Sequence, residues 1–107
     1  MKIEDFEVEK EAWVVKHGVK DVKLTRLVLM SKCKRGYEVF IDGFNYCSCC
    51  GALVHEDCKA VMLGVQKLEV LLKDAVSVDE LKKMRFNTRI SAALAKLEEE
   101  SWWECGE

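Results

Sequence analysis

Residues 47–58 have the sequence CSCCGALVHEDC and hold four of the six cysteines and one of the two histidines of this 107-residue chain. The spacing Cys-x2-Cys-x4-His-x2-Cys is typical of zinc ligands, because thiolate sulfur and imidazole nitrogen are donors that a tetrahedral zinc ion takes. A Cys-x2-Cys turn followed by glycine lets both sulfurs point at one ion. His55 and Cys58 would share a face in the first turn of a helix. The segment therefore predicts a zinc knuckle at the centre of the fold.

Composition and charge indicate a single globular domain. Half of the residues are apolar and the net charge is −2, so no global field favours nucleic acid or an anionic membrane. The acidic first residues contain no apolar leader, and no stretch approaches the roughly 20 apolar residues of a membrane span. We therefore expect a cytoplasmic protein without a membrane segment. In that compartment clustered cysteines indicate metal binding rather than disulfides.

Residues 1–46 are typical of antiparallel β-structure. Apolar and polar residues alternate over residues 21–33, which predicts a long strand with one drier face. Arg35-Gly36 and Asp42-Gly43 are predicted turns, and residues 37–41 between them form a β-branched and aromatic run. We expect an N-terminal antiparallel β-meander of about three strands.

Residues 59–101 predict a helical hairpin. From Cys58 onward, apolar residues recur at three- and four-residue spacing, as in an amphipathic helix. Ser77 and Glu80 form a capping box that would start a second helix, antiparallel to the first. The expected fold class is α+β in a single domain over residues 1–107. Its parts are a β-meander over 1–46, a zinc knuckle over 47–58 and a C-terminal helical hairpin.

The wider pattern Cys33-x13-Cys47-x2-Cys50-x4-His55-x2-Cys58 resembles the ligand spacing of the zinc fingers that bind diacylglycerol in protein kinase C relatives. Its His-x2-Cys end is similar to that of plant-homeodomain fingers. The resemblance covers roughly half of the chain and implies a treble-clef-like finger. In such a finger, a β-hairpin over residues 34–46 and a helix after the knuckle would both bring ligands to one ion.

The resemblance also implies a second way to divide the ligands. In the diacylglycerol-binding family the ligands of two ions interleave, which would assign His17, Cys47 and Cys50 to one ion, and Cys33, His55 and Cys58 to the other. Two further ligand positions of that family hold Met30 and Gln66, which are poor ligands. Lipid binding is therefore not carried over to this chain.

We favour a single zinc ion, with two ligand sets left open. The first set is Cys47, Cys50, His55 and Cys58. The second joins Cys33 to Cys47 and Cys50, with either His55 or Cys58 as the fourth ligand. The candidate metal ligands are therefore Cys33, Cys47, Cys50, His55 and Cys58, and the expected cofactor is Zn²⁺.

The cysteines also have two competing explanations. They can be inert buried thiols, or Cys47-x2-Cys50 can form a redox pair of the thioredoxin type. The thioredoxin fold needs a cis-proline beside its cysteines, and this chain contains no proline. We expect Cys49 to point away from its neighbours as a spectator and Cys105 to be a free thiol.

These features favour a small non-enzymatic zinc protein. The expected role is a protein-interaction module, an adaptor or an inhibitor of a larger enzyme, because no catalytic set is visible and aromatic residues such as Trp13 and Phe44 suit interface anchors. The second hypothesis is nucleic-acid binding through residues 16–35, which are rich in lysine and arginine. Apolar faces on both predicted helices would also suit a homodimer.

Overall fold

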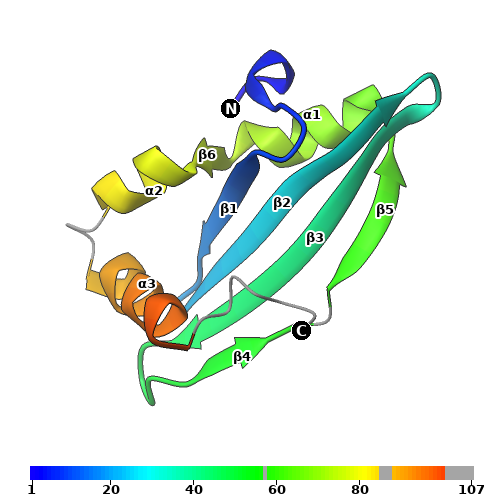
Figure 1. Ribbon diagram of the computed structural model, residues 1–107. Helices are drawn as coiled ribbons and strands as arrows, with labels where there is room; N and C mark the ends of the chain where they lie inside the picture. The colour runs from blue at the N-terminus through cyan, green and yellow to red at the C-terminus, as the bar shows by residue number, and fades with distance from the viewer. Residues whose placement is uncertain (57, 85–87, 101–107) are drawn as a thin grey trace.

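A computed structural model of the chain describes residues 1–56, 58–84 and 88–100, with side chains described as far as residue 97. Within these residues the strands form one six-stranded sheet in the order β4-β3-β2-β1-β6, and β5 pairs with the same edge of β3 as β4 does. Figure 1 shows the long, twisted β2–β3 ribbon at the centre of this sheet. The α+β class, the antiparallel sheet and the C-terminal helices are confirmed.

The strands β1 (Glu11–His17), β2 (Asp21–Cys33) and β3 (Gly36–Cys47) form the predicted antiparallel meander. The sheet is completed by three shorter strands, which are β4 (Leu53–His55), β5 (Lys59–Leu63) and β6 (Ala75–Ser77). Strand β2 is long because apolar residues alternate along it, although the register with β3 shifts between Leu29 and Ser31. The three-stranded meander is therefore the centre of a larger sheet, and two short strands, β4 and β5, together form its edge beside β3.

Helices cover both faces of the sheet. On one face, Trp13, Leu24 and Phe44 pack with residues of α2 (Val78–Lys83) and α3 (Thr88–Glu100). We call this side the α3 face. Strand side chains alternate between the two sides, so Val14 and Leu27 point to the opposite side, where they pack with α1 (Val65–Lys73). The short 3-10 helix η1 (Ile3–Asp5) lies beside α1 on this α1 face (Figure 1).

Polar contacts fix the helices to the sheet. The predicted cap is confirmed at α2, where Ser77 Oγ accepts a hydrogen bond from the backbone N–H of Glu80 at 3.2 Å. The Arg89 guanidinium of α3 donates to the carbonyl oxygens of Gly18 and Val19, at 2.7 and 2.6 Å. These contacts tie α3 to the β1–β2 turn, at the end of the sheet where β3 also ends.

The predicted β-hairpin over residues 34–46 is wrong. Asp42-Gly43 lies inside β3, and the whole segment after the turn is one strand of 12 residues. The acidic Asp42 is tolerated there because Arg26 lies opposite it in the register of β2. A tertiary charge pair thus overrides the turn preference of this dipeptide.

The predicted helix starting near Cys58 is also wrong at its beginning. Residues 59–63 form β5, and the helix begins only at Val65. His55 ends β4, so it does not share a helical turn with Cys58. A short apolar run suits either a strand or a helix, and here the unpaired edge of β3 selects the strand. The helices α1 and α3 pack on opposite faces of the sheet, so the predicted hairpin between them does not form.

Candidate metal centre

Three side chains with metal-ligating atoms meet beneath the broken edge strand. Strand β4 pairs with residues 44–46 of β3, and β5 pairs with residues 37–41. The connection between β4 and β5 therefore passes beside Asp42 and Gly43, and the Glu56 N–H donates to the Gly43 carbonyl at 2.8 Å. This route places His55 and Cys58 next to Asp42.

The ligand atoms of these three residues lie close together. His55 Nε2 lies 2.5 Å from Asp42 Oδ1, and Cys58 Sγ lies 3.0 Å from the same oxygen. Cys58 Sγ lies 3.4 Å from His55 Nε2. Within the described residues, this is the group of three whose ligand atoms all lie within 4.8 Å of one another. We call Asp42, His55 and Cys58 the Asp42 centre.

Asp42 is held in place by a buried ion pair. Its side chain is 0% exposed, and Arg26 Nη2 lies 2.6 Å from Asp42 Oδ2. A charge removed from water in this way needs a close partner, because burial alone would strongly disfavour it. Arg26 Nη1 also lies 3.7 Å from Glu11 Oε1. Arg26 thus contacts Oδ2 of Asp42, and the other carboxylate oxygen, Oδ1, faces His55 and Cys58.

His55 and Cys58 are the partly exposed members of the Asp42 centre. The His55 side chain is 21% exposed, and its ring packs on Phe44 with the two ring centroids 4.9 Å apart. The same atom, Nε2, faces both Asp42 and Cys58. A Cys-His-Asp catalytic triad instead uses the two ring nitrogens for its two partners. The geometry therefore suits convergence on an ion rather than proton relay to a nucleophile.

The oxidation state of Cys58 controls what this arrangement can bind. Cys58 is disulfide-bonded in this structure. A thiolate is the metal-ligating form of cysteine, so the sulfur becomes a ligand only after reduction. In the reduced protein the Asp42 centre offers one oxygen, one nitrogen and one sulfur donor. A tetrahedral zinc ion would take a fourth ligand beyond these three.

Cys47 and Cys50 lie in a different place from the Asp42 centre. They belong to the turn over residues 47–51, which we call the Cys47 turn. Cys47 lies five residue steps beyond Asp42 in the extended strand, roughly 16 Å along β3. Side chains alternate along β3, so Phe44 and Asp42 point to the α3 face, whereas Cys47 is at a position of the opposite face. The structure therefore brings together two of the predicted ligands, His55 and Cys58, and separates them from Cys47 and Cys50.

The Cys47 turn has its own electrostatics. The backbone N–H groups of Cys50 and Cys49, followed by the Cys50 thiol, donate to the Cys47 sulfur and lower the pKa of this thiol. Loss of hydration, followed by the charge on Cys47, raises the pKa of Cys49. The charge on Cys47 thus acts on Cys49, while the expectation that Cys49 points away as a spectator stays a prediction.

Cys33 lies far from both groups. It pairs with Gly36 at the tip of the β2–β3 ribbon, and Cys47 lies 11 residue steps from that tip, roughly 36 Å along β3. The Cys33 sulfur is exposed and lies 4.0 Å from Met62 Sδ. His17, at the end of β1, is also exposed. Cys105 lies outside the described residues.

Sequence reasoning missed Asp42 and Arg26. A signal for them exists in β2, where Arg26 occupies the same alternating positions as the apolar Val22 and Leu24. A charged residue at such a position must be buried with a partner, and only the register of β3 identifies that partner as Asp42.

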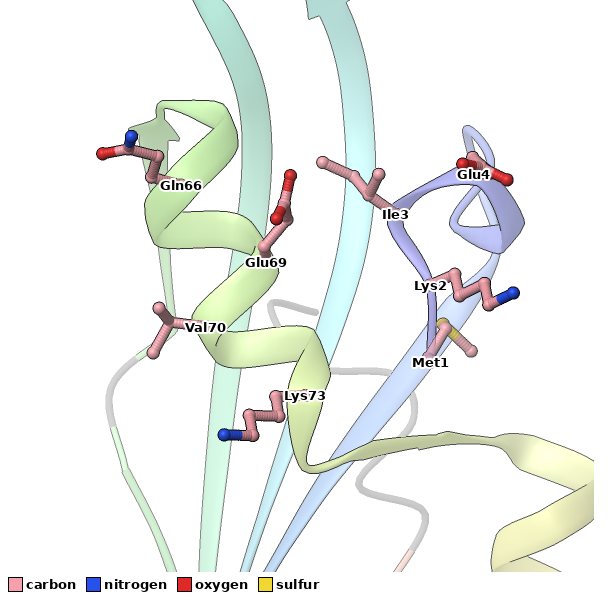
Figure 2. A pocket seen from close by; sticks show the side chains of 8 residues that line it. All are labelled: Met1, Lys2, Ile3, Glu4, Gln66, Glu69, Val70 and Lys73. Atoms are coloured by element: carbon pink, nitrogen blue, oxygen red, sulfur yellow. The ribbon is translucent and has the colours of Figure 1, made fainter.

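A groove on the other side of the molecule has less defined chemistry. It lies between α1 and the N-terminal segment, has a volume of 640 Å³, and is lined by Met1, Lys2, Ile3, Glu4, Gln66, Glu69, Val70 and Lys73. Figure 2 shows that these side chains spread along the two walls instead of converging on one point. Its two acidic and two basic residues leave the groove without an excess of either charge. It therefore offers neither a charged surface nor the convergent donor atoms of the Asp42 centre.

Comparisons with known proteins give no relative. No protein-family model matches the chain, and neither curated proteins nor solved structures give a significant match. Among the described residues, no helix is long and apolar enough to cross a membrane.

Proposed function

We propose that the reduced protein binds one zinc ion through Asp42, His55 and Cys58, and that the zinc-bound form acts as a protein-interaction module. The observation that carries this proposal is the convergence of three different donor atoms within 4.8 Å of one another. His55 and Cys58 lie 13 and 16 residues from Asp42 in the sequence, so the ion would stabilise long-range structure. Bound metal contributes to the free energy of folding whenever the unfolded chain lacks a preformed site.

The donor set favours zinc over the other common divalent ions. Calcium and magnesium prefer sites made of oxygen atoms, whereas imidazole and thiolate together suit zinc. Arg26 would act on the ligand carboxylate from outside the coordination shell. By holding Asp42 Oδ2 at 2.6 Å, it orients Oδ1 toward the ion. The ring of Phe44 supplies an apolar wall beside His55.

The proposed role of the ion is to fix the edge of the sheet. Strands β4 and β5 are short, with three and five residues, and both depend on pairing with β3. A metal that joins Asp42 of β3 to residues at the end of β4 and the start of β5 would lock both pieces of the edge. A locked edge presents a defined surface to another protein.

Exposed apolar residues on this edge support a protein partner. Met62 on β5 is 54% exposed, and Val54 on β4 is 58% exposed. Methionine side chains adapt to many shapes and are common on binding surfaces. The fourth position of the zinc ion offers such a partner a further contact, through a donor atom of its own. This combination favours an adaptor or an inhibitor over an enzyme.

Nucleic-acid binding receives less support from the arrangement of basic residues. Arg26 is buried against Asp42, and Lys23 pairs with Glu56 at 3.3 Å. Lys16 and Lys20 lie at one end of the β2–β3 ribbon, whereas Lys32, Lys34 and Arg35 lie at its other end. A nucleic-acid surface would need these charges on one continuous strip.

Zinc binding is tested on reduced protein by native mass spectrometry and by competition with a chromophoric chelator. We expect one zinc ion per chain, lost in His55→Ala and in Cys58→Ser. Cys33→Ser is the matched control, because this exposed cysteine lies far from the Asp42 centre. Absence of bound zinc, or loss of zinc in Cys47→Ser with retention in Cys58→Ser, would contradict the proposal.

The interaction role is tested separately. Immobilised zinc-loaded protein and the His55→Ala variant are compared as baits in a lysate of the native host at low and high salt. A protein captured only by the zinc-loaded bait, at both salt concentrations, is the expected result. Capture of nucleic acid that disappears at high salt would favour the second hypothesis, because phosphate contacts depend steeply on salt.

A further inference from the structure

Cys58 has two chemical roles at the Asp42 centre. It is the sulfur ligand that the proposed zinc site requires, and it is also the cysteine that the structure shows in a disulfide bond. The other cysteines of the described residues are free, and they are Cys33, Cys47, Cys49 and Cys50. In the described part of the chain, the oxidised cysteine is therefore the one that lies among metal-ligating atoms.

The sulfur of Cys58 already lies where a metal ligand is needed. In the oxidised protein, Cys58 Sγ is 3.0 Å from Asp42 Oδ1 and 3.4 Å from His55 Nε2. A disulfide sulfur carries no proton, so it cannot donate to this carboxylate, whereas a reduced thiol at the same place can. Arg26 holds Asp42, and Phe44 packs on the ring of His55. Reduction therefore creates the third ligand while the other two stay in place.

The disulfide of Cys58 is accessible to small thiols. Cys58 is half-buried and lies in the connection between β4 and β5, at the edge of the sheet. The neighbouring residues Glu56 and Lys59 are exposed. Thiol–disulfide exchange requires an attacking thiolate to reach the sulfur, so a half-buried sulfur in an exposed connection can react.

We propose that Cys58 makes the Asp42 centre a redox switch, in which the disulfide and the zinc ion exclude each other. This inference rests on the zinc site proposed above. A thiolate is the metal-ligating form of cysteine, and a sulfur bonded to a second sulfur has lost that form. The oxidised centre keeps only the oxygen of Asp42 and the nitrogen of His55, which is fewer than the three protein ligands of a catalytic zinc. Oxidation of Cys58 therefore releases the ion.

Both directions of the switch balance as thiol–disulfide exchange. In reduction, a dithiol supplies two electrons and two protons, the S–S bond of Cys58 breaks, two protein thiols form, and the dithiol closes to a cyclic disulfide. Zinc then replaces the proton of the Cys58 thiol, and this proton goes to solvent. In oxidation, glutathione disulfide accepts two electrons, the protein S–S bond forms again, and zinc leaves. One proton from solvent completes the two glutathione thiols.

Zinc and the disulfide must act on each other reciprocally. Because zinc binds the reduced form and not the oxidised form, free zinc at about 100 times its dissociation constant should shift the thiol–disulfide equilibrium of Cys58 by about 100-fold toward the thiol. For a two-electron couple, this factor corresponds to about 60 mV in the reduction potential. The zinc-loaded centre should therefore protect Cys58 from mild oxidants.

The test is equilibration of the protein in glutathione buffers of graded thiol-to-disulfide ratio, with free zinc either held constant by a metal buffer or removed by a chelator. Alkylation and peptide mass spectrometry measure the fraction of Cys58 present as thiol and identify its disulfide partner. In wild-type protein, we expect zinc to shift the equilibrium constant by about 100-fold when free zinc is about 100 times its dissociation constant. Bound zinc should fall in step with the Cys58 thiol.

Two variants serve as matched controls. His55→Ala keeps Cys58 but lacks the zinc site, so zinc should leave its Cys58 equilibrium unchanged. Cys33→Ser changes an exposed cysteine outside the centre and should respond to zinc as the wild type does. The comparison of wild-type protein with and without zinc needs neither variant, so it stands even where a variant fails to fold.

Failure of the switch is distinguishable from failure of the zinc site. If reduced wild-type protein binds no zinc in native mass spectrometry, the zinc site itself is wrong, and the switch with it. If the reduced protein binds zinc but the oxidised protein binds it equally well, the switch alone is overturned. An unchanged Cys58 equilibrium in zinc-saturated wild-type protein would overturn it in the same way.

Discussion

The Asp42 centre and the Cys47 turn both contain cysteine, but they are built in opposite ways. The Asp42 centre combines an oxygen donor of β3 with nitrogen and sulfur donors of residues 55 and 58, and its carboxylate is fully buried. The Cys47 turn uses neighbouring residues of one loop, where Cys49 and Cys50 are exposed. The Asp42 centre depends on the pairing of distant strands, whereas the Cys47 turn is closed by hydrogen bonds within residues 47–52 and is attached to the β1–β2 turn through Ser48 and Lys20.

The largest expected effect comes from the buried ion pair. Asp42→Ala removes the carboxylate that lies 2.6 Å from the buried Arg26 guanidinium, and Glu11 Oε1 lies 3.7 Å from the same guanidinium. We expect this variant to lose roughly 3–5 kcal/mol of unfolding free energy, because removing one partner of a buried ion pair is costly. Urea denaturation followed by tryptophan fluorescence measures the change.

The control for this prediction removes both charges. The double variant Arg26→Met/Asp42→Leu should recover most of the lost stability, since well-packed apolar residues often replace a buried ion pair without cost. Both variants should lack the zinc site and keep the Cys47 turn. A loss of less than about 1 kcal/mol in Asp42→Ala would show that the pair is not essential to the fold.

The next effect concerns the register of the edge strand. Gly36 has a φ of 145°, and a Cβ at this position would collide with the backbone oxygen of Leu63, at the end of β5. Gly36→Ala should therefore cost roughly 2–4 kcal/mol, from backbone strain and overpacking together. It should also weaken zinc binding, because Cys58 directly precedes β5 and moves when β5 moves.

Gly43→Ala provides the matched comparison. A Cβ at Gly43 would lie 2.7 Å from Glu56 Oε2, which belongs to a flexible and exposed side chain. This carboxylate can rotate away at the cost of its surface contact with Lys23, so the change should stay within about 1 kcal/mol. Equal losses in the two alanine variants, measured by thermal unfolding, would contradict the assigned role of Gly36.

The smallest effect is a difference between two thiols of the Cys47 turn. Hydrogen bonds from Cys50 and Cys49 lower the pKa of Cys47, whereas loss of hydration raises the pKa of Cys49. Alkylation requires the thiolate, so the reaction of Cys47 should begin at a lower pH than that of Cys49. Peptide mass spectrometry after iodoacetamide pulses at several pH values measures both profiles. The reverse order would show that the turn does not stabilise the Cys47 thiolate.

The sequence predicted local features better than pairings between distant segments. The alternation in residues 21–33 predicted β2, and Ser77 with Glu80 predicted the cap of α2, because each depends on neighbouring residues. Asp42-Gly43 was misassigned as a turn because the partner that keeps it in a strand, Arg26, lies 16 residues away. The cysteine spacing predicted His55 and Cys58 as members of one ligand set, and the structure places them side by side, but the spacing could not supply Asp42, which only the sheet register brings to them.

The composition of the zinc shell distinguishes the structural account from the spacing-based prediction. X-ray absorption spectroscopy at the zinc edge, on reduced protein loaded with one equivalent of zinc, counts the sulfur ligands directly. Ligation by Asp42, His55 and Cys58 predicts one sulfur at about 2.3 Å, with nitrogen and oxygen ligands at about 2.0–2.2 Å. Two or three sulfur ligands would instead place Cys47 and Cys50 on the ion, and would contradict the Asp42 centre as the zinc site.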